Sequence, residues 1–171
     1  SSDLARDLGV KIAGPDADDP ATAGDAERQA RLAEAMKLWE QSYAWYRKAA
    51  ELEPQDPRIV NDCGLMLLYH LHRDYEAARG MFERAVELGT AQLAELAKDA
   101  DASQREFLEE ATGDALQNLG VLAQKNLHRP VGEWKPYFEK AVGYFPYQRR
   151  EAARELARLA GGAPADQDKP D

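Results

Sequence analysis

The sequence predicts an all-α protein of stacked helical hairpins, and three observations lead to this prediction. Ala, Leu, Glu and Arg, which favour helices, dominate the 171 residues, and runs rich in Val, Ile and Thr are absent. Apolar residues recur at three- and four-residue intervals through most of residues 25–160. Residues 60–89 hold two such patterns around a polar corner, and the arrangement returns near the C-terminus.

Composition limits the classes of function. The length fits one domain with a proper core. A formal net charge of -9 argues against broad binding to nucleic-acid phosphates. The single cysteine, Cys63, excludes an internal disulfide framework and a CxxC metal or redox pair. Because no apolar run approaches 18 residues, we expect no membrane insertion and a soluble protein, cytoplasmic or exported if a signal preceded residue 1.

Both ends of the chain are predicted to lack a packed structure. Residues 1–24 read as a flexible acidic leader, because their prolines, small residues and aspartates bury too little apolar surface to offset ordering of the backbone. Residues 161–171 are predicted to be a disordered tail on the same grounds. A second possibility for the leader is a short segment that docks through apolar side chains: Leu4, Leu8, Val10 and Ile12.

Residues 25–160 are predicted to form the repeat domain. Asp25 is a suitable N-cap for residues 26–52, which form one long helix or two helices with a corner near Leu38. Pro57 suits the first turn of the next helix, which runs to residue 71. A third helix is expected over residues 74–88, with Gly89 as its C-cap.

An acidic insertion follows at residues 90–112. It is predicted to contain a short helix over residues 91–98 and a turn with Ser103 as the next N-cap. Three further helices are expected, over residues 104–127, 133–143 and 147–160. Pro130, Gly132 and Pro146 separate them.

Internal repetition is the strongest signal in the chain. An offset of 56 residues matches both helices and the corner between them: Gly64 with Gly120, His72 with His128, Phe82 with Phe138, and Ala85 with Ala141. Tyr46 and Ala49 match Phe82 and Ala85 at an offset of 36, which sets the unit length. We expect the glycines to let two antiparallel helices approach closely while each phenylalanine fills the neighbouring gap.

These residues resemble the tetratricopeptide repeat, whose pattern places Leu-Gly, Ala, an aromatic residue, Ala and Pro along 34 residues. The second unit supplies Val60, Cys63-Gly64, Leu67, Ala78, Phe82 and Ala85, and the third supplies Leu116, Leu119-Gly120, Ala123, Phe138, Ala141 and Pro146. Two extra residues per hairpin and AWYRKAAE at residues 44–51 also resemble the sel-like variant, although Leu-His-Arg replaces its glycine-rich corner. The resemblance implies a right-handed α-solenoid of about three hairpins with a C-terminal capping helix.

What the family implies is binding of a peptide or partner protein in a concave groove lined by the first helix of each hairpin. Position by position, this implies Arg58, Asn61, Leu65, Leu68 and Tyr69 in the second unit and Asp114, Gln117, Val121, Gln124 and Lys125 in the third. Asp114 and Val121 do not match the Lys and Asn that a carboxylate-clamp subgroup carries. Two other interpretations remain for this face: an ordinary solvated surface, or one covered by the insertion.

Catalytic and metal sites are not predicted, and neither is a cofactor. His70 and His72 with Asp74 could be taken for a metal cluster, but residues i and i+2 of a helix point to different sides. The recurrence of His72 at His128 instead favours a helix C-cap. Cys63 lies on the apolar stripe and is predicted to be a buried residue rather than a nucleophile. A non-enzymatic interaction or scaffolding module is therefore expected.

Two alternatives stay open. The last helix carries Arg149, Arg150, Arg154 and Arg158 opposite small apolar residues, so it is predicted to cap the last hairpin, with an anion or membrane-surface patch as the alternative. The alternative function is structural self-assembly of repeats between chains, to which exposed tryptophans would contribute: Trp39, Trp45 and Trp134. A monomer or weak homo-oligomer is expected.

Overall fold

The computed structural model describes residues 2–15, 24–96, 101–145 and 148–161, and these residues contain helices but no strand. The all-α class is therefore confirmed for the described part of the chain. The elements are α1 Ser2–Ala13, α2 Ala26–Leu52, α3 Pro57–Leu65, the π-helix η2 Met66–Leu71, α4 Tyr75–Glu95, α5 Ala102–Val121, the π-helix η3 Leu122–Asn126, α6 Val131–Ala141 and α7 Arg150–Leu159.

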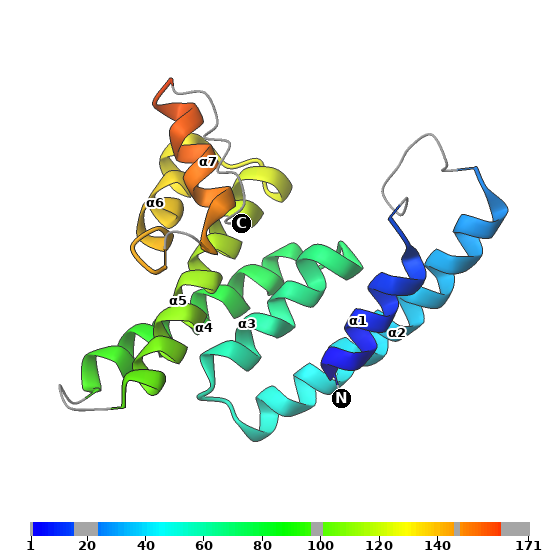
Figure 1. Ribbon diagram of the computed structural model, residues 1–171, viewed down its shortest axis with the longest axis horizontal. Coiled ribbons are helices and arrows are strands. Elements are labelled where there is room, and N and C mark those ends of the chain that lie inside the picture. The colour runs from blue at the N-terminus through cyan, green and yellow to red at the C-terminus, as the bar shows by residue number, and fades with distance from the viewer. Residues whose placement is uncertain (1, 16–23, 97–100, 146–147, 162–171) are drawn as a thin grey trace, which may run out of the picture.

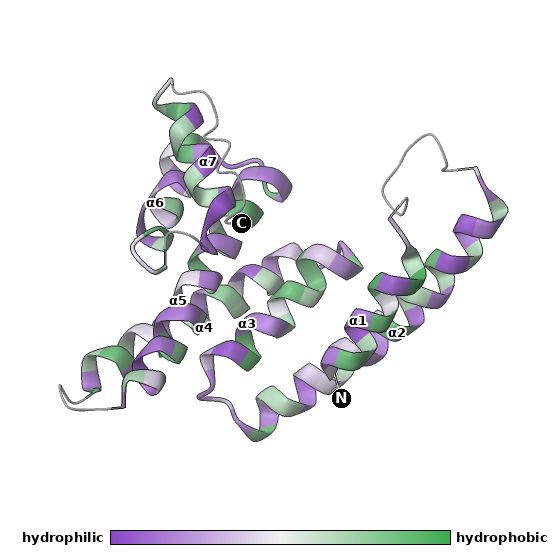
Figure 2. Ribbon diagram, viewed as in Figure 1, coloured by the Kyte–Doolittle hydropathy of each residue, from purple (hydrophilic) through white to green (hydrophobic). Residues whose placement is uncertain are grey.

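Each helix packs mainly against the helices that precede and follow it in the chain. Consecutive helices cross the molecule from α1 and α2 at one end to α6 and α7 at the other (Figure 1). Hydrophobic and hydrophilic residues alternate along nearly every helix, so each buries one stripe and exposes another (Figure 2). Among the described residues, the neighbouring helices α1–α2, α3–α4 and α5–α6 are antiparallel and are called here the first, second and third hairpins; α4 also packs on α5, and α7 follows α6.

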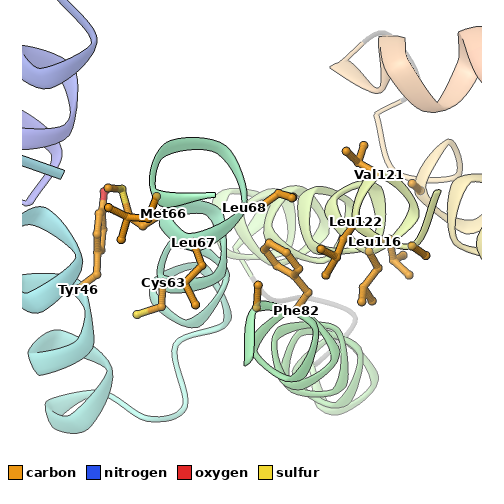
Figure 3. Close-up of a cluster of buried hydrophobic side chains, with 14 of the residues drawn as sticks. Tyr46, Cys63, Met66, Leu67, Leu68, Phe82, Leu116, Val121 and Leu122 are labelled. Carbon is orange, nitrogen blue, oxygen red and sulfur yellow. The ribbon is translucent and has the colours of Figure 1, made fainter. Parts of the chain in front are cut away.

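The hydrophobic core is one cluster of side chains that extends across successive helices (Figure 3). It runs from Tyr46 of α2 through Met66 and Leu67 of η2 and Phe82 of α4 to Leu122 of η3. Each pair of helices therefore shares buried surface with the next pair, and no pair buries its apolar stripe alone.

The 56-residue repetition is present in the backbone as well as in the sequence. η2 begins at Met66 and η3 at Leu122, so both π-helices occupy the same place in their hairpins. His72 and His128 then adopt the left-handed conformation, with φ of 48° and 50°. The following arginine in each copy donates its backbone N–H six residues back, from Arg73 to Leu67 O and from Arg129 to Ala123 O. These bonds close the helix end, so the predicted capping role of the corner is confirmed in backbone form.

The predicted packing of glycine against phenylalanine is also confirmed. A Cβ atom added at Gly64 would lie 2.7 Å from Phe82 Cε1, and one added at Gly120 would lie 2.3 Å from Phe138 Cε1. Both phenylalanines are completely buried. The two glycines are therefore required by close helix approach and carry no chemistry of their own.

The prediction of a flexible leader is wrong for residues 2–15. Residues 2–13 form α1, which lies antiparallel to α2; Ser42 Oγ donates to Ser2 O at 2.8 Å, and Trp39 Nε1 donates to Arg6 O at 3.3 Å. The buried side of α1 consists of Ala5, Gly9 and Ala13, whereas Leu4 and Leu8 point outward. The second possibility, a short segment docked on the body, agrees with this packing. Small residues make the close approach, however, and of the four apolar side chains expected to dock, Ile12 is the one partly buried against the core. Residues 16–23 lie outside the described residues.

Several helix boundaries differ from the expected ones. Residues 26–52 form one helix, capped by Asp25 as predicted. Gly89 is not a C-cap, because α4 continues to Glu95; the glycine instead lies where Thr112 of α5 crosses. Asp101 rather than Ser103 caps α5, since its carboxylate accepts the Ser103 N–H at 3.1 Å. The described parts of the insertion therefore extend α4 and α5 instead of forming a separate unit.

The C-terminal boundaries shift by two or three residues. α6 runs from Val131 to Ala141 and α7 begins at Arg150, where helices over 133–143 and 147–160 were expected. Residues 146–147 and the predicted tail beyond Gly161 lie outside the described residues.

Candidate functional site

The third-unit part of the predicted groove lies under α7. Gln117 Oε1 accepts the Ala152 N–H at 3.5 Å, and Gln124 Nε2 donates to Glu155 at 2.8 Å. Lys125 forms an ion pair with Glu151. Val121, a further member of this set, is 3% exposed. The chain thus covers its own third-unit surface, and α7 packs on α5 and α6 as the predicted cap does.

Arg149, which directly precedes α7, links the start of that helix to α5. Its guanidinium is 2% exposed, forms an ion pair with Asp114 and donates to Glu110 O at 3.0 Å. Gly113 makes room for it, because a Cβ there would lie 2.7 Å from Arg149 Nε. Burial raises the pKa of Asp114, and the charge of Arg149 offsets part of that rise. Asp114 is therefore paired within the chain, although its side chain is 43% exposed.

Much of the second-unit part of the predicted groove packs against α5. Hydrogen bonds among three polar side chains, called here the polar ladder, make this contact: Asn61, Asn118 and Tyr69. Asn61 and Leu68 are each 3% exposed. Asn118 Nδ2 donates to Asn61 Oδ1 at 3.0 Å, and the Tyr69 hydroxyl donates to Asn118 Oδ1 at 3.1 Å. These bonds hold the consecutive helices α3 and η2 against α5. Asn61 and Leu68 are therefore buried within the chain rather than open to a partner.

The remaining second-unit residues keep part of their surface exposed. The Arg58 guanidinium lies 5.0 Å from the ring centroid of Phe107 in the insertion, but Arg58 remains exposed, so this contact does not cover the face. Leu65 is half-buried, and Tyr69 is 38% exposed. Of the ten predicted residues, Tyr69 alone combines an exposed apolar surface with a neighbouring pocket.

That pocket, named here the Met36 pocket, lies between α1, α2 and η2 and has a volume of about 410 Å³. Its lining residues are Val10, Ala13, Gly14, Leu32, Met36, Trp39, Tyr69, His70 and His72. Three of them are exposed apolar side chains from three elements: Val10 of α1, Met36 of α2 and Tyr69 of η2. The sequence placed Met36 and Trp39 on a buried stripe and Val10 in the leader, so it did not bring these residues together.

The rings in the Met36 pocket have defined partners. The Trp39 and His70 rings lie 5.2 Å apart with their planes tilted by 34°. Burial, followed in effect by the charge of Arg6, lowers the pKa of His70 to about 4, so its imidazole is neutral at pH 7. Burial raises the pKa of Tyr69, which keeps its hydroxyl protonated. None of the lining residues is Asp, Glu, Lys or Arg.

A second pocket, of about 380 Å³, lies between the second and third hairpins beside Leu122 and Tyr137. The arginines on its rim are already paired: Arg79 lies 2.8 Å and Arg129 lies 3.6 Å from Glu76 carboxylate oxygens. The charges of these arginines are therefore matched within the chain, whereas exposed apolar side chains line the Met36 pocket.

The other sequence candidates are structural. Cys63 is 2% exposed, and burial raises the pKa of its thiol to about 12, as a core residue requires. No group of three His, Cys, Asp or Glu side chains within the described ranges could hold a metal ion. Among the helices that the structure describes, none is long and apolar enough to cross a membrane. Trp39 and Trp134 are buried, and Trp45 is 41% exposed.

Comparison of the chain with models of protein families, with curated proteins and with solved structures finds no match.

Proposed function

We propose that this chain is a non-enzymatic protein–protein interaction module of the tetratricopeptide-repeat type. In this proposal α1–α2, α3–α4 and α5–α6 are three repeats of a right-handed α-solenoid, and α7 is its capping helix. The recurrence of the π-helix, the left-handed histidine and the glycine–phenylalanine contact at one offset supports the repeat assignment.

The observation that carries the binding function is the convergence of Val10, Met36 and Tyr69 on one pocket. Their exposed fractions are 49%, 39% and 38%. Apolar side chains exposed together around a concave site are typical of a surface that another molecule covers. The binding surface is therefore the Met36 pocket with its rim, and it lies N-terminal to the groove that the sequence predicted.

A selection from a displayed random-peptide library tests this proposal. We expect peptides selected on the wild-type chain to lose at least tenfold in affinity for Met36→Asp, because the variant places a charge at the pocket. Leu52→Asp is the matched control, since Leu52 is another exposed apolar residue of α2 that does not line the pocket. Failure to enrich any peptide, or equal loss in both variants, would contradict the proposal.

Self-assembly is the alternative function, and one observation favours it. Leu4 and Leu8 of α1 are 68% and 44% exposed, and Trp45 and Leu52 of α2 are exposed as well. Light scattering during size-exclusion chromatography distinguishes the two functions. A mass that rises with concentration and returns to the monomer value in Leu4→Glu/Leu8→Glu supports self-assembly, whereas a monomer at all concentrations rejects it.

A further inference from the structure

We infer that the Met36 pocket binds a neutral aromatic ring, supplied by a tryptophan or phenylalanine side chain of the partner. The inference rests on the proposed function in that the ring belongs to a partner protein. It goes further in naming the chemical group that enters the pocket. Three properties of the pocket lead to it: its charge, its hydrogen-bonding groups and its rings.

The first property is charge. No Asp, Glu, Lys or Arg lines the pocket among the described residues. An ammonium or carboxylate entering it would lose water without gaining an opposite charge, which is strongly unfavourable. Charge complementarity therefore selects an uncharged group.

The second property is the state of the hydrogen-bond donors. Trp39 Nε1 already donates to Arg6 O, and the Tyr69 hydroxyl already donates to Asn118 Oδ1. Both rings are thus held by bonds within the chain. The imidazoles of His70 and His72 are the other side-chain hydrogen-bonding groups of the lining, so an occupant with several polar groups would leave some of them unpaired, which is costly on burial.

The third property is the kind of apolar surface. Four rings line the pocket, those of Trp39, Tyr69, His70 and His72, and Met36 supplies a polarisable thioether. Ring–ring and sulfur–ring contacts add to the attraction that apolar burial alone gives. A volume of about 410 Å³ lies in the range of sites for small groups and accommodates an indole or phenyl ring. An aromatic ring therefore suits the pocket better than an alkyl chain does.

The pocket is open because the junction between the first and second hairpins differs from the junction between the second and third. At the second junction, the hydrogen bonds of the polar ladder (Asn61, Asn118 and Tyr69) hold α3 and η2 against α5. On their other side α3 and η2 pack on α2, and the α1 end of the pocket is lined by Val10, Ala13 and the adjacent Gly14. These side chains are too small to fill the space over Trp39, so a ring from outside completes the packing.

A titration with indole, monitored by the ¹⁵N–¹H signals of the full chain, tests the inference. Indole is expected to shift the indole N–H signal of Trp39 and the amides around Tyr69. Tryptamine and indole-3-acetate, which carry a charge, are expected to bind at least tenfold more weakly. Cyclohexanol, a neutral ring without π electrons, is expected to bind about three- to tenfold more weakly.

Two variants locate the binding. Met36→Trp fills the pocket with the chain's own ring and should abolish the indole shifts, whereas Leu52→Trp adds the same ring elsewhere and should leave them unchanged. If Met36→Trp fails to fold, Val10→Trp at the opposite wall replaces it. Indole shifts that are absent, survive the filled pocket or are matched by the charged analogues overturn the inference.

The outcomes separate this inference from the function it rests on. Selected peptides that bind through the pocket but contain no aromatic residue would leave the interaction module standing and overturn the ring assignment. Indole binding in the pocket with no peptide enriched would retain the ring site and reject the interaction module.

Discussion

The second and third hairpins are the same on the inside and different on the outside. Both contain a glycine under a phenylalanine, a π-helix and a left-handed histidine at matching positions. On the outer face, however, Tyr69 of the second hairpin borders an open pocket, while its counterpart Lys125 is paired with Glu151 of α7. Repeated residues thus maintain the fold, and positions that differ between the copies are the ones available for function.

The largest expected effect tests the shared interior. Gly120→Leu forces a side chain into Phe138, and we expect it to lower the free energy of unfolding by about 3 kcal/mol, with a loss of about 2 kcal/mol for Gly64→Leu. The order follows from the closest contacts of an added Cβ, 2.3 Å at Gly120 and 2.7 Å at Gly64. Urea denaturation followed by circular dichroism measures both.

Gly80→Ala is the control for these variants. Gly80 lies in α4 with nothing within 4 Å of an added Cβ, so alanine there should stabilise the helix by about 0.5–1 kcal/mol. Equal stability of Gly64→Leu and the wild type would remove the packing explanation of the repeat.

A smaller loss is expected where the two hairpins are fastened together. Asn118→Ala removes both bonds of the polar ladder and leaves the buried Asn61 Oδ1 without its donor, which should cost about 1–3 kcal/mol. Tyr69→Phe removes one of the two bonds and should cost about 1 kcal/mol. Lys125→Ala removes a partly exposed ion pair under α7 and should cost less than about 1 kcal/mol. An Asn118→Ala variant as stable as Lys125→Ala would show that the ladder contributes nothing beyond a surface contact.

Two buried groups of the second hairpin, Asp62 and His70, are expected to contribute to the pH dependence of stability. Burial raises the pKa of Asp62 to about 6 and lowers that of His70 to about 4, whereas the third hairpin has asparagine at both corresponding positions, Asn118 and Asn126. Asp62 stabilises the fold while protonated, so its contribution is lost as pH rises from 3.8 to 6. His70 stabilises it while neutral, so its contribution is lost as pH falls from 6.5 to 4.

Replacing each group with the residue of the sister hairpin separates the two contributions. In Asp62→Asn the free energy of unfolding should rise between pH 4 and 6, because only the His70 contribution remains. In His70→Asn it should fall over the same interval, because only the Asp62 contribution remains. Urea denaturation at pH 4, 5 and 6 measures the slopes, and equal slopes in the two variants would show that neither group titrates as its burial implies.

The interior of the repeats was predictable from sequence because packing there depends on side-chain size at fixed spacing. The spacing of Gly64 and Phe82, and of Gly120 and Phe138, predicts a close contact between two helices wherever the helical period is kept. The α1 helix was not predictable in this way. Its buried stripe of Ala5, Gly9 and Ala13 has little apolar area, so composition resembled that of an unpacked leader.

The candidate site was predictable only at Tyr69. The Met36 pocket depends on where α1 stops against η2, and no local pattern encodes a gap between helices that are far apart in sequence. The cover of the third unit by α7 likewise depends on tertiary contacts such as Arg149 with Asp114. A family pattern identifies which face a residue occupies, whereas the neighbour that covers that face is decided by the rest of the chain.

The smallest expected effect on stability concerns a matched pair of histidines, His72 and His128, of which only His72 lines the Met36 pocket. His72 and His128 both adopt the left-handed conformation, which costs an L-residue about 1–2 kcal/mol relative to glycine and is only partly offset by the greater freedom of glycine in the unfolded chain. We expect His72→Gly and His128→Gly each to raise the free energy of unfolding by about 0.5 kcal/mol, because the two histidines share the same left-handed backbone conformation. Only His72 lines the Met36 pocket, so indole affinity should change in His72→Gly and stay at the wild-type value in His128→Gly. Unequal stabilities of the two variants would mean that the two histidine positions are not equivalent. A changed indole affinity in His128→Gly would mean that the third hairpin influences the Met36 pocket through the core, which contradicts the division into a shared interior and independent outer faces.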